Sequence, residues 1–193
     1  MTSLLAVTLL AFCAIEAGEL PRSTALPSGL HNPMPGGTLA GYAADTGLDI
    51  AGSPRPVFAL AAGTLDYSEA GHTLWTGRRD TPYTIRFELD EPIRFGDHLV
   101  THVYYGHLSR LAHVQHEHEG ARRHVEAGEY LGFSGVARGS PHLHVGLLLD
   151  GEVSQAWGTF LSADEIREVL GGLRNKTRLP KDTAADVIYE RFR

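Results

Sequence analysis

The sequence predicts a mainly β fold, a twisted antiparallel sheet or sandwich with a short helix near the C-terminus. Short runs rich in Val, Leu, Ile, Phe and Tyr recur along the chain, and several alternate between apolar and polar residues as half-buried strands do. Glycines separate these runs, as expected for tight turns. The chain has 193 residues, 42% hydrophobic and 21% charged, which is enough for one domain with a real core.

The strands are expected within a domain that spans residues 36–155. Residues 18–35 are rich in Pro, Ser and Gly and predict an extended lead-in to that domain. The polar segment Ala112–His124 predicts a surface loop. The strand-like runs are, in order, Pro56–Leu65, Tyr83–Leu89, His98–Leu108, Tyr130–Ser134 and His142–Leu149.

Residues 156–193 predict a helical extension after the sheet. Ser162 and Glu165 have the spacing of a capping box and precede the run IREVLGGL, so a short helix is expected to begin there. The tail from Asn175 onward is charged, and we expect it either to pack as a second helix or to fray.

The first 17 residues have the features of an export signal. They are mostly apolar, too short to span a bilayer, and end in small residues with a cleavage position after Ala17. However, no Lys or Arg precedes Arg22, so the usual positive start is missing. Two alternatives remain: the segment belongs to the folded domain, or Cys13 lies in a loose lipoprotein-like box.

Charge and cysteine content exclude several function classes. The net charge is −6, from 17 Lys and Arg against 23 Asp and Glu, and the chain has no dense basic run. We therefore expect no nucleic-acid or anionic-membrane partner. Because Cys13 is the single cysteine, an internal disulfide and a thiolate zinc cluster are both excluded. Any metal has to be bound by His, Asp or Glu.

His142 and His144 are the most conspicuous candidate ligands. Residues i and i+2 of a strand point to the same face, with Cα atoms roughly 6.5–7 Å apart, so both imidazoles can reach one small volume. Leu143 and Val145 would then point into the opposite layer. A bare His-x-His is a weak signal, and a pair of structural core histidines is its default interpretation.

Two other stretches carry residues of the same chemical type. Asp45 and Asp49 flank Gly47 just before an apolar run, and two such close carboxylates repel each other unless a cation lies between them. A turn-forming or calcium-like pair is the alternative. His107 ends an apolar run and, taken alone, is an ordinary loop histidine.

Taken together and in this order, these stretches resemble the lysostaphin/LytM-type zinc metallopeptidases, β-rich enzymes with a duplicated-hybrid-motif fold that cut peptide bonds in bacterial peptidoglycan. That family reads His-x-Gly-x-Asp-Ile, an apolar strand ending in Gly, Tyr-x-His-Leu-Ser, V-x-x-G-x-x-(I/L)-G-x-(S/T)-G and His-Leu-His. The resemblance covers roughly residues 33–150. The counterparts here are DTGLDI (45–50), PVFALAAGTL (56–65), YGHLS (105–109), VEAGEYLGFSG (125–135) and SPHLHVGL (140–147).

Carried over by position, the resemblance makes Asp49 and His144 metal ligands and His107 and His142 catalytic histidines beside the attacking water. It implies zinc as cofactor, hydrolysis of peptidoglycan peptides by a metal-activated water, and a secreted or periplasmic bacterial protein. The chemistry is consistent, because a catalytic zinc needs about three protein ligands and an open position. Imidazoles can then accept the proton and stabilise the oxyanion. Tyr105 would share a strand face with His107 and contact substrate.

One position departs from the family pattern. The first ligand of the family is a histidine four residues before the aspartate, and here that position is Asp45. Carboxylate oxygen binds zinc, but the harder donor set also suits Mn²⁺. Three outcomes are open: Asp45 binds the metal, His31 or His72 replaces it, or the metal site is weak or lost. In the last case the domain would be a degenerate module that binds peptidoglycan or regulates a partner hydrolase. A purely pH-sensitive histidine cluster is a further alternative.

The other histidines are expected outside the site. His98 and His102 lie four apart in a strand-like run and are expected at the surface or in a cleft. His116 and His118 lie in the polar loop, where adventitious metal binding is conceivable and a solvated loop is the simpler interpretation.

Overall fold

The computed structural model describes residues 19–41, 46–73, 77–154, 156 and 158–192. The export signal expected in residues 1–17 and the expected metal ligand Asp45 therefore lie outside the described residues. Within the described ranges, neither helix has the length and apolar character that a membrane crossing requires.

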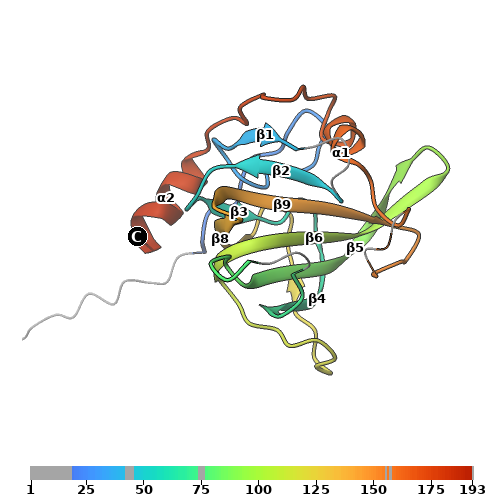
Figure 1. Cartoon of the computed structure of the whole chain (residues 1–193), viewed down its shortest axis with the longest axis horizontal. Coiled ribbons are helices and arrows are strands. Elements are labelled where there is room, and N and C mark those ends of the chain that lie inside the picture. Colours follow the sequence, from blue (N-terminus) through green and yellow to red (C-terminus); the bar gives the residue numbers. More distant parts are fainter. Residues whose placement is uncertain (1–18, 42–45, 74–76, 155, 157, 193) are drawn as a thin grey trace, which may run out of the picture.

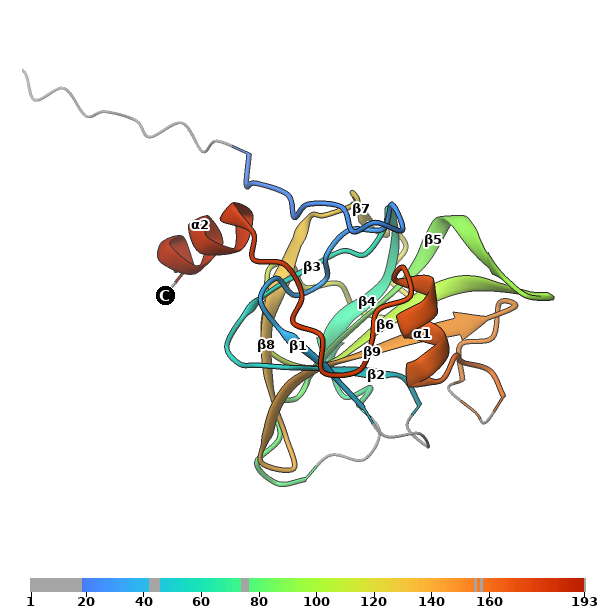
Figure 2. The same ribbon diagram turned by 90° about the horizontal axis from the view of Figure 1, so that it is seen from above.

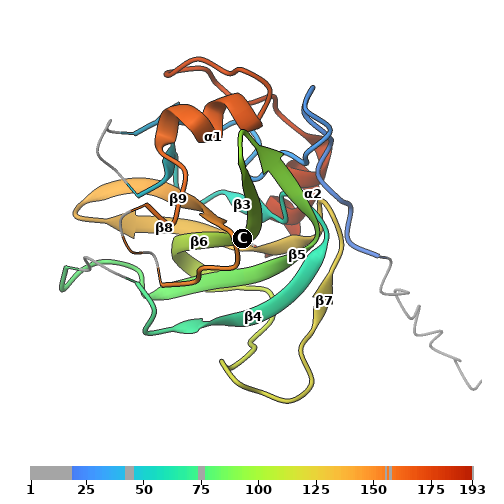
Figure 3. The ribbon, with the colours of Figure 1, turned by 90° about the vertical axis from the view of Figure 1, so that its right-hand side faces the viewer.

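The described residues form one nine-stranded antiparallel sheet followed by two helices, which confirms the predicted mainly β fold (Figure 1). The strands make a single continuous sheet and not two facing sheets, and this sheet is strongly curved (Figure 3). The elements are β1 (Thr38–Ala40), β2 (Leu48–Ala51), β3 (Pro56–Phe58), β4 (Gly63–Ala70), β5 (Tyr83–Phe95), β6 (His98–Leu111), β7 (His124–Val125), β8 (Tyr130–Ala137), β9 (Ser140–Leu149), α1 (Ala163–Val169) and α2 (Thr183–Phe192).

Strand β9 lies at the centre of the pairing. The order across the sheet is β1-β2-β9-β8-β6-β5-β4-β7, with β3 on β8 and an additional pairing between β9 and β6. β9 therefore contacts β2 along one edge and both β8 and β6 along the other (Figure 1). This arrangement brings the end of β6, the start of β9 and the short strand β2 together, although they are far apart in the sequence.

Most predicted strands are observed with longer bounds, but Pro56–Leu65 is wrong as a single strand. It divides into β3, which pairs with β8, and the start of β4, which pairs with β5 and β7. Between them the chain turns through the core, where Ala59 N–H donates to Glu129 O and Leu60 N–H donates to the Tyr105 hydroxyl. An apolar run can be continuous in sequence and still change sheet partners, because hydrophobicity does not specify the strand neighbour.

The core packs between the sheet and the two helices. Its larger part is built from Leu, Ile, Val, Phe and Tyr side chains of the long strands together with α1 residues, and Ile166 is fully buried there. A smaller apolar group joins α2 to β3 and β8. The helices lie at opposite ends of the domain, α1 near β2 and α2 near β3 (Figure 2).

The predicted capping box is present at the start of α1. The Ser162 hydroxyl accepts from Glu165 N–H at 3.4 Å, and Glu165 Oε2 accepts from Ser162 N–H at 2.8 Å. Two N–H groups that a helix start leaves without intrahelical partners are thereby satisfied.

Candidate functional site

The sheet register brings four of the predicted site residues together. On β2, Asp49 lies directly opposite His144 of β9, and on the other side of β9 His144 lies opposite Gly106 of β6. His107 follows Gly106 in β6, and His142 lies two residues before His144 in β9. Asp49, His107, His142 and His144 thus come from three adjacent strands to one face of the sheet.

Distances within this cluster are short. Asp49 Oδ1 lies 3.1 Å from His144 Nδ1 and 3.6 Å from His142 Nε2. The centroid of the His107 ring lies 5.0 Å from that of His142 and 6.0 Å from that of His144. The expectation that His142 and His144 share a face is confirmed, and Leu143 between them is fully buried on the opposite side.

The environment of Asp49 keeps its carboxylate charged. Burial by itself would raise the pKa of Asp49. The hydrogen bond with His144 and the nearby imidazoles of His142, His144 and His107 outweigh that effect, so the net shift of the Asp49 pKa is downward. A buried carboxylate that remains ionised is a suitable anionic ligand for a metal ion.

His107 experiences the opposite effect. Burial and the proximity of His142 and His144 lower the pKa of His107 to about 4, and the nearby Asp49 offsets this only in part. The ring is therefore neutral near pH 7. Its Nδ1 atom is buried and has no hydrogen-bond partner among the described residues. An unpaired buried ring nitrogen costs about 1–3 kcal/mol, which a structure normally avoids outside functional positions.

The backbone of His107 adopts a left-handed conformation. Its φ is +63°, a region that costs a residue with a side chain about 1–3 kcal/mol. Thr81 holds this conformation: its hydroxyl donates to His107 O at 2.7 Å and accepts from Val136 N–H at 3.0 Å. Gly135 permits the approach, since a Cβ there would lie 2.6 Å from His107 O. Nothing in the sequence pattern singled out Thr81, which lies far from the recognised motifs.

This left-handed residue overturns the expected role of Tyr105. Between the pairs Tyr83↔Leu108 and Ile85↔Tyr105 the strand β6 holds one more residue than β5, a β-bulge that changes which side chains face the core. Tyr105 is fully buried and its hydroxyl donates to Phe58 O at 3.0 Å. Its expected contact with substrate is therefore wrong, because the side chain is fixed inside the core.

Tyr104 lies on the site face instead. Its ring centroid is 6.1 Å from that of His144, in an edge-on arrangement, and its hydroxyl donates to His72 O at 3.4 Å. Sequence reasoning missed it because strict alternation places residue 105, and not 104, on the same face as His107. The pair Gly106-His107 within an apolar run is the signal that could have indicated a bulge.

Asp49 and His144 present two donor atoms suited to a metal. With metal–ligand bonds of 2.0–2.1 Å, two ligands of a tetrahedral zinc lie about 3.3 Å apart. The 3.1 Å between Asp49 Oδ1 and His144 Nδ1 is close to that value. Thr46 Oγ1 lies 3.4 Å from His144 Nε2, so a hydrogen on Nε2 would have an acceptor if Nδ1 bound a metal. These residues fit one divalent metal, with a third ligand still needed.

The two histidines considered as replacements for Asp45 are both engaged elsewhere. His31 Nδ1 donates to Ser23 O, beside Gly128. The His72 ring is stacked on Tyr67 at 3.9 Å, and its Nε2 bonds to Glu69 at 2.9 Å. Neither imidazole joins the Asp49–His144 pair, so the expectation that one of them replaces Asp45 is wrong.

Another acid–histidine cluster lies on β4, β5 and β6. In the described part of the chain, Asp66, Glu88 and His102 are the group whose three ligand atoms all lie within 4.8 Å of one another. However, Arg86 Nε is 2.7 Å and Arg122 is 2.8 Å from the two oxygens of Asp66. The arginines already neutralise this carboxylate, so the group is an ion-pair network and a poorer metal site.

Comparisons with known proteins find similar solved structures only. No family model matches the chain, and no curated protein matches it. Similar solved structures include the catalytic domain of the antimicrobial peptidase lysostaphin from Staphylococcus simulans, with 25% identity, 61% of this chain and 74% of that chain covered, and a TM-score of 0.41.

Two further solved structures are similar at lower identity. The antimicrobial peptidase lysostaphin from Staphylococcus simulans has 20% identity, 78% and 54% coverage and a TM-score of 0.49. The catalytic domain of a mutant of the prophage-encoded M23 protein EnpA from Enterococcus faecalis has 20% identity, 69% and 91% coverage and a TM-score of 0.43. This chain spans about half of the longer lysostaphin structure. Likeness of this degree does not by itself assign a function.

Proposed function

We propose that this protein is a metal-dependent endopeptidase that hydrolyses peptide cross-links of peptidoglycan, with zinc as its metal. The observation that supports this most is the convergence of Asp49, His107, His142 and His144 from three strands onto one face. These four residues lie in motifs whose order and spacing resemble the lysostaphin/LytM-type peptidases.

Asp49 Oδ1 and His144 Nδ1 would hold the metal, with Asp45 as the third ligand. A divalent metal bound there would supply a Lewis acid that polarises a carbonyl group and lowers the pKa of a water molecule. Since two of these three ligands are carboxylates, Mn²⁺ is a second candidate beside Zn²⁺.

His142 would move a proton in the proposed reaction. Ser140 O, which can only accept, lies 2.9 Å from His142 Nδ1, so Nδ1 carries the hydrogen of the neutral ring. Nε2 is then the basic nitrogen, and it lies on the Asp49 side of the ring at 3.6 Å from Oδ1. His142 Nε2 can accept a proton from an attacking water and later return it to the leaving amine.

His107 would act as the second catalytic imidazole. Because burial lowers its pKa to about 4, the ring enters the reaction neutral, with one nitrogen carrying a hydrogen. The N–H of such a ring can donate to an oxygen on which negative charge develops, and a fixed donor in a buried site is more effective than water. Tyr104 borders the same face, with its ring 6.1 Å from that of His144.

A protein of this kind acts in the bacterial cell envelope, and we propose secretion or export to the periplasm for this chain. The apolar segment in residues 1–17 supports this location. Peptidoglycan peptides would be its substrate, with no nucleic-acid partner, as the net charge of −6 suggests.

The competing proposal is a catalytically inactive module that binds peptidoglycan or regulates a partner hydrolase. Asp45, where the related peptidases have histidine, is the observation that favours it. Against it stands the preservation of the rest of the cluster in a costly arrangement, with an unpaired His107 Nδ1 and a strained His107 backbone.

Digestion of purified peptidoglycan tests the proposal. Zinc-loaded protein is incubated with cross-linked sacculi, and the cross-linked peptide dimers that remain are quantified by chromatography. We expect dimers to disappear, chelator to stop the reaction, and His142→Ala to lower the rate by about 100-fold or more. His116→Ala, which removes an exposed loop histidine, is the matched control and should digest like the parent. Binding to sacculi without any loss of dimers would overturn the proposal in favour of the inactive module.

A further inference from the structure

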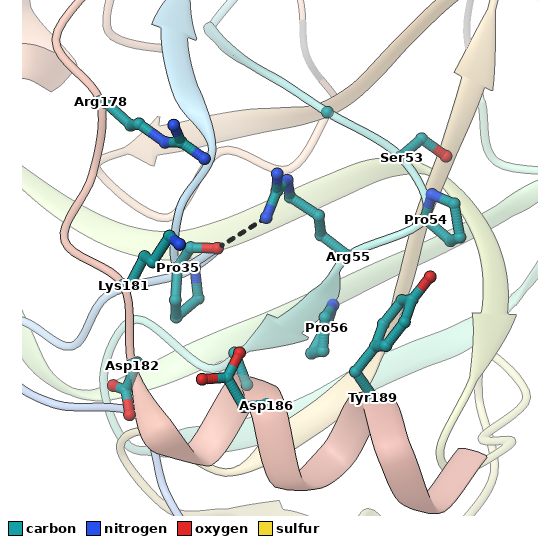
Figure 4. A pocket seen from close by; sticks show the side chains of 12 residues that line it. Pro35, Ser53, Pro54, Arg55, Pro56, Arg178, Lys181, Asp182, Asp186 and Tyr189 are labelled. Carbon is teal, nitrogen blue, oxygen red and sulfur yellow. Dashed lines mark hydrogen bonds between the residues drawn. The ribbon is translucent and has the colours of Figure 1, made fainter. Parts of the chain in front are cut away.

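A pocket of about 480 Å³ is lined by none of the four residues of the histidine cluster (Figure 4). One wall is the connection between β2 and β3, residues 52–55, with the first residue of β3. The other is the C-terminal segment that leads into α2 together with the first turns of α2. The C-terminal wall belongs to the part of the chain that the peptidase motifs do not cover, so those motifs give the pocket no role.

Three cationic side chains gather around one glycine at this pocket. Arg178 Nε donates to Gly36 O at 3.2 Å. A Cβ on Gly36 would lie 3.0 Å from Arg55 Nη1 and 3.7 Å from Lys181 Cγ, so both side chains pack against the bare backbone of this residue. In Figure 4 the three cationic groups lie on the same side of the pocket, with Asp186 and Tyr189 of α2 on the other side.

These cations have no anionic partner in the described part of the protein. None of Arg55, Arg178 and Lys181 has a carboxylate oxygen within 4.0 Å among the described residues. Asp182, the nearest acidic residue in sequence, accepts from Thr24 N–H and Ala184 N–H and is committed to the start of α2.

Uncompensated like charges that line one pocket repel each other and attract an anion. Backbone carbonyls contribute only partial neutralisation, through the hydrogen bonds from Arg178 to Gly36 O and from Arg55 Nη1 to Pro35 O at 3.5 Å. Because the chain as a whole carries a net charge of −6, this cationic group is a local feature and does not reflect a generally basic protein.

We propose that this pocket binds a phosphate ester. A tetrahedral phosphate group offers acceptor oxygens in several directions, which matches two guanidinium groups and one ammonium group that arrive from different segments. A carboxylate has two coplanar oxygens and would leave part of this donor set unused. The carboxylate of Asp186 and the hydroxyl of Tyr189, on the opposite side, suit an organic part that carries hydroxyl groups, such as a polyol phosphate.

Ligand titration of the full chain tests this binding site independently of any hydrolytic activity. Glycerol phosphate, a poly(glycerol phosphate) chain, inorganic phosphate and acetate are titrated separately, and dissociation constants are measured by calorimetry at fixed ionic strength. We expect the phosphate compounds to bind and acetate to bind at least about tenfold more weakly. If poly(glycerol phosphate) binds more tightly than glycerol phosphate, the ligand is a polymer. If the two bind equally, the ligand is a small phosphate ester.

Matched variants localise the binding. Arg178→Gln combined with Lys181→Gln should weaken binding of glycerol phosphate at least about tenfold, since each charged hydrogen bond contributes to affinity. Arg174→Gln removes the same charge from an exposed residue of the same segment, outside the pocket, and should bind like the parent.

His144→Ala removes a candidate metal ligand and should also bind glycerol phosphate like the parent, which separates this pocket from the proposed metal site. Unchanged affinity of the Arg178→Gln, Lys181→Gln variant, or binding of acetate as tight as that of phosphate, would overturn the proposal.

Discussion

Replacement of Thr81 by valine should disturb His107 while leaving the proposed metal ligands intact. Valine has nearly the shape of threonine but lacks the hydroxyl that donates to His107 O at 2.7 Å and accepts from Val136 N–H at 3.0 Å. The carbonyl of His107 and the N–H of Val136 would then lose the partner that fixes them. The perturbation acts on the backbone that orients the imidazole, so Thr81 is a positioning residue.

The size of the effect follows from two opposing contributions to the conformation of His107. The Thr81 hydroxyl contacts stabilise it, so that their loss costs about 1–3 kcal/mol. The left-handed backbone, with φ of +63°, destabilises it by a similar amount, about 1–3 kcal/mol. Without Thr81 Oγ1 the strained conformation is therefore no longer clearly favoured, and His107 is expected to relax. For a chain of this length, a loss of about 2 kcal/mol lowers Tm by about 4–8 °C. A corresponding loss in transition-state stabilisation lowers the rate about 10- to 100-fold.

Thermal unfolding and peptidoglycan digestion are measured on Thr81→Val and on Thr81→Ser, which keeps the hydroxyl. We expect the serine variant to recover most of the parent rate and the valine variant to retain the parent metal content. A valine variant that is destabilised but digests at the parent rate would show that Thr81 is merely structural. A variant equal to the parent in both measurements would refute the reasoning entirely.

Three further predictions concern the core, the acid stability and the first metal ligand. Tyr105→Phe leaves Leu60 N–H buried without its partner, so the free energy of unfolding in urea should fall by about 1–3 kcal/mol. KM and kcat should stay unchanged, and a raised KM would show that Tyr105 binds substrate after all. Burial by itself would raise the pKa of Glu129, but its hydrogen bonds with His113 and Arg123 outweigh burial and lower the pKa to about 2. The contribution of the ionised Glu129 to the free energy of unfolding is present above pH 4.5 and is lost as pH falls toward about 2. The free energy of unfolding in urea should therefore change less between pH 6 and pH 3 in Glu129→Gln than in the parent. An equal change in both proteins would contradict this. Asp45→His should retain or raise peptidoglycan hydrolysis if residue 45 binds the metal, and a variant that loses activity would argue against that position as a ligand.

The sequence was sufficient for those parts of the site that depend on regular strands. His142 and His144 share a face because β9 continues without interruption through both residues, and strand periodicity alone predicts this. Their proximity to Asp49 depends on the pairing of β2 with β9, which local sequence does not determine. The order of the motifs supplied that information through their resemblance to a family.

Where the backbone departs from regularity, prediction from sequence failed. His107 adopts a left-handed conformation at a bulge, so alternation assigned Tyr105 to the site face although it lies in the core. Thr81 reaches His107 from a loop with no recognisable pattern, and only the folded chain reveals that contact. The run from Pro56 to Leu65 likewise changes sheet partners without any change in hydrophobic character.

The cationic pocket was also not predicted from the sequence. Arg55 is separated from Arg178 and Lys181 by more than a hundred residues of chain, and none of the three belongs to a dense basic run. They meet because Gly36 offers a bare backbone against which their side chains pack. Local charge density in a folded protein depends on such tertiary contacts, which composition and net charge do not report.

Metal content of the purified protein tests the central claim most directly. The parent chain, Asp49→Asn and His144→Ala are each equilibrated with zinc, freed of loosely bound ions by gel filtration, and measured by mass spectrometry of the metal. We predict about one zinc per parent chain and a loss of most of it in both variants, because each removes one donor of the 3.1 Å pair. A parent chain without zinc, or variants that retain as much zinc as the parent, would contradict the proposed site.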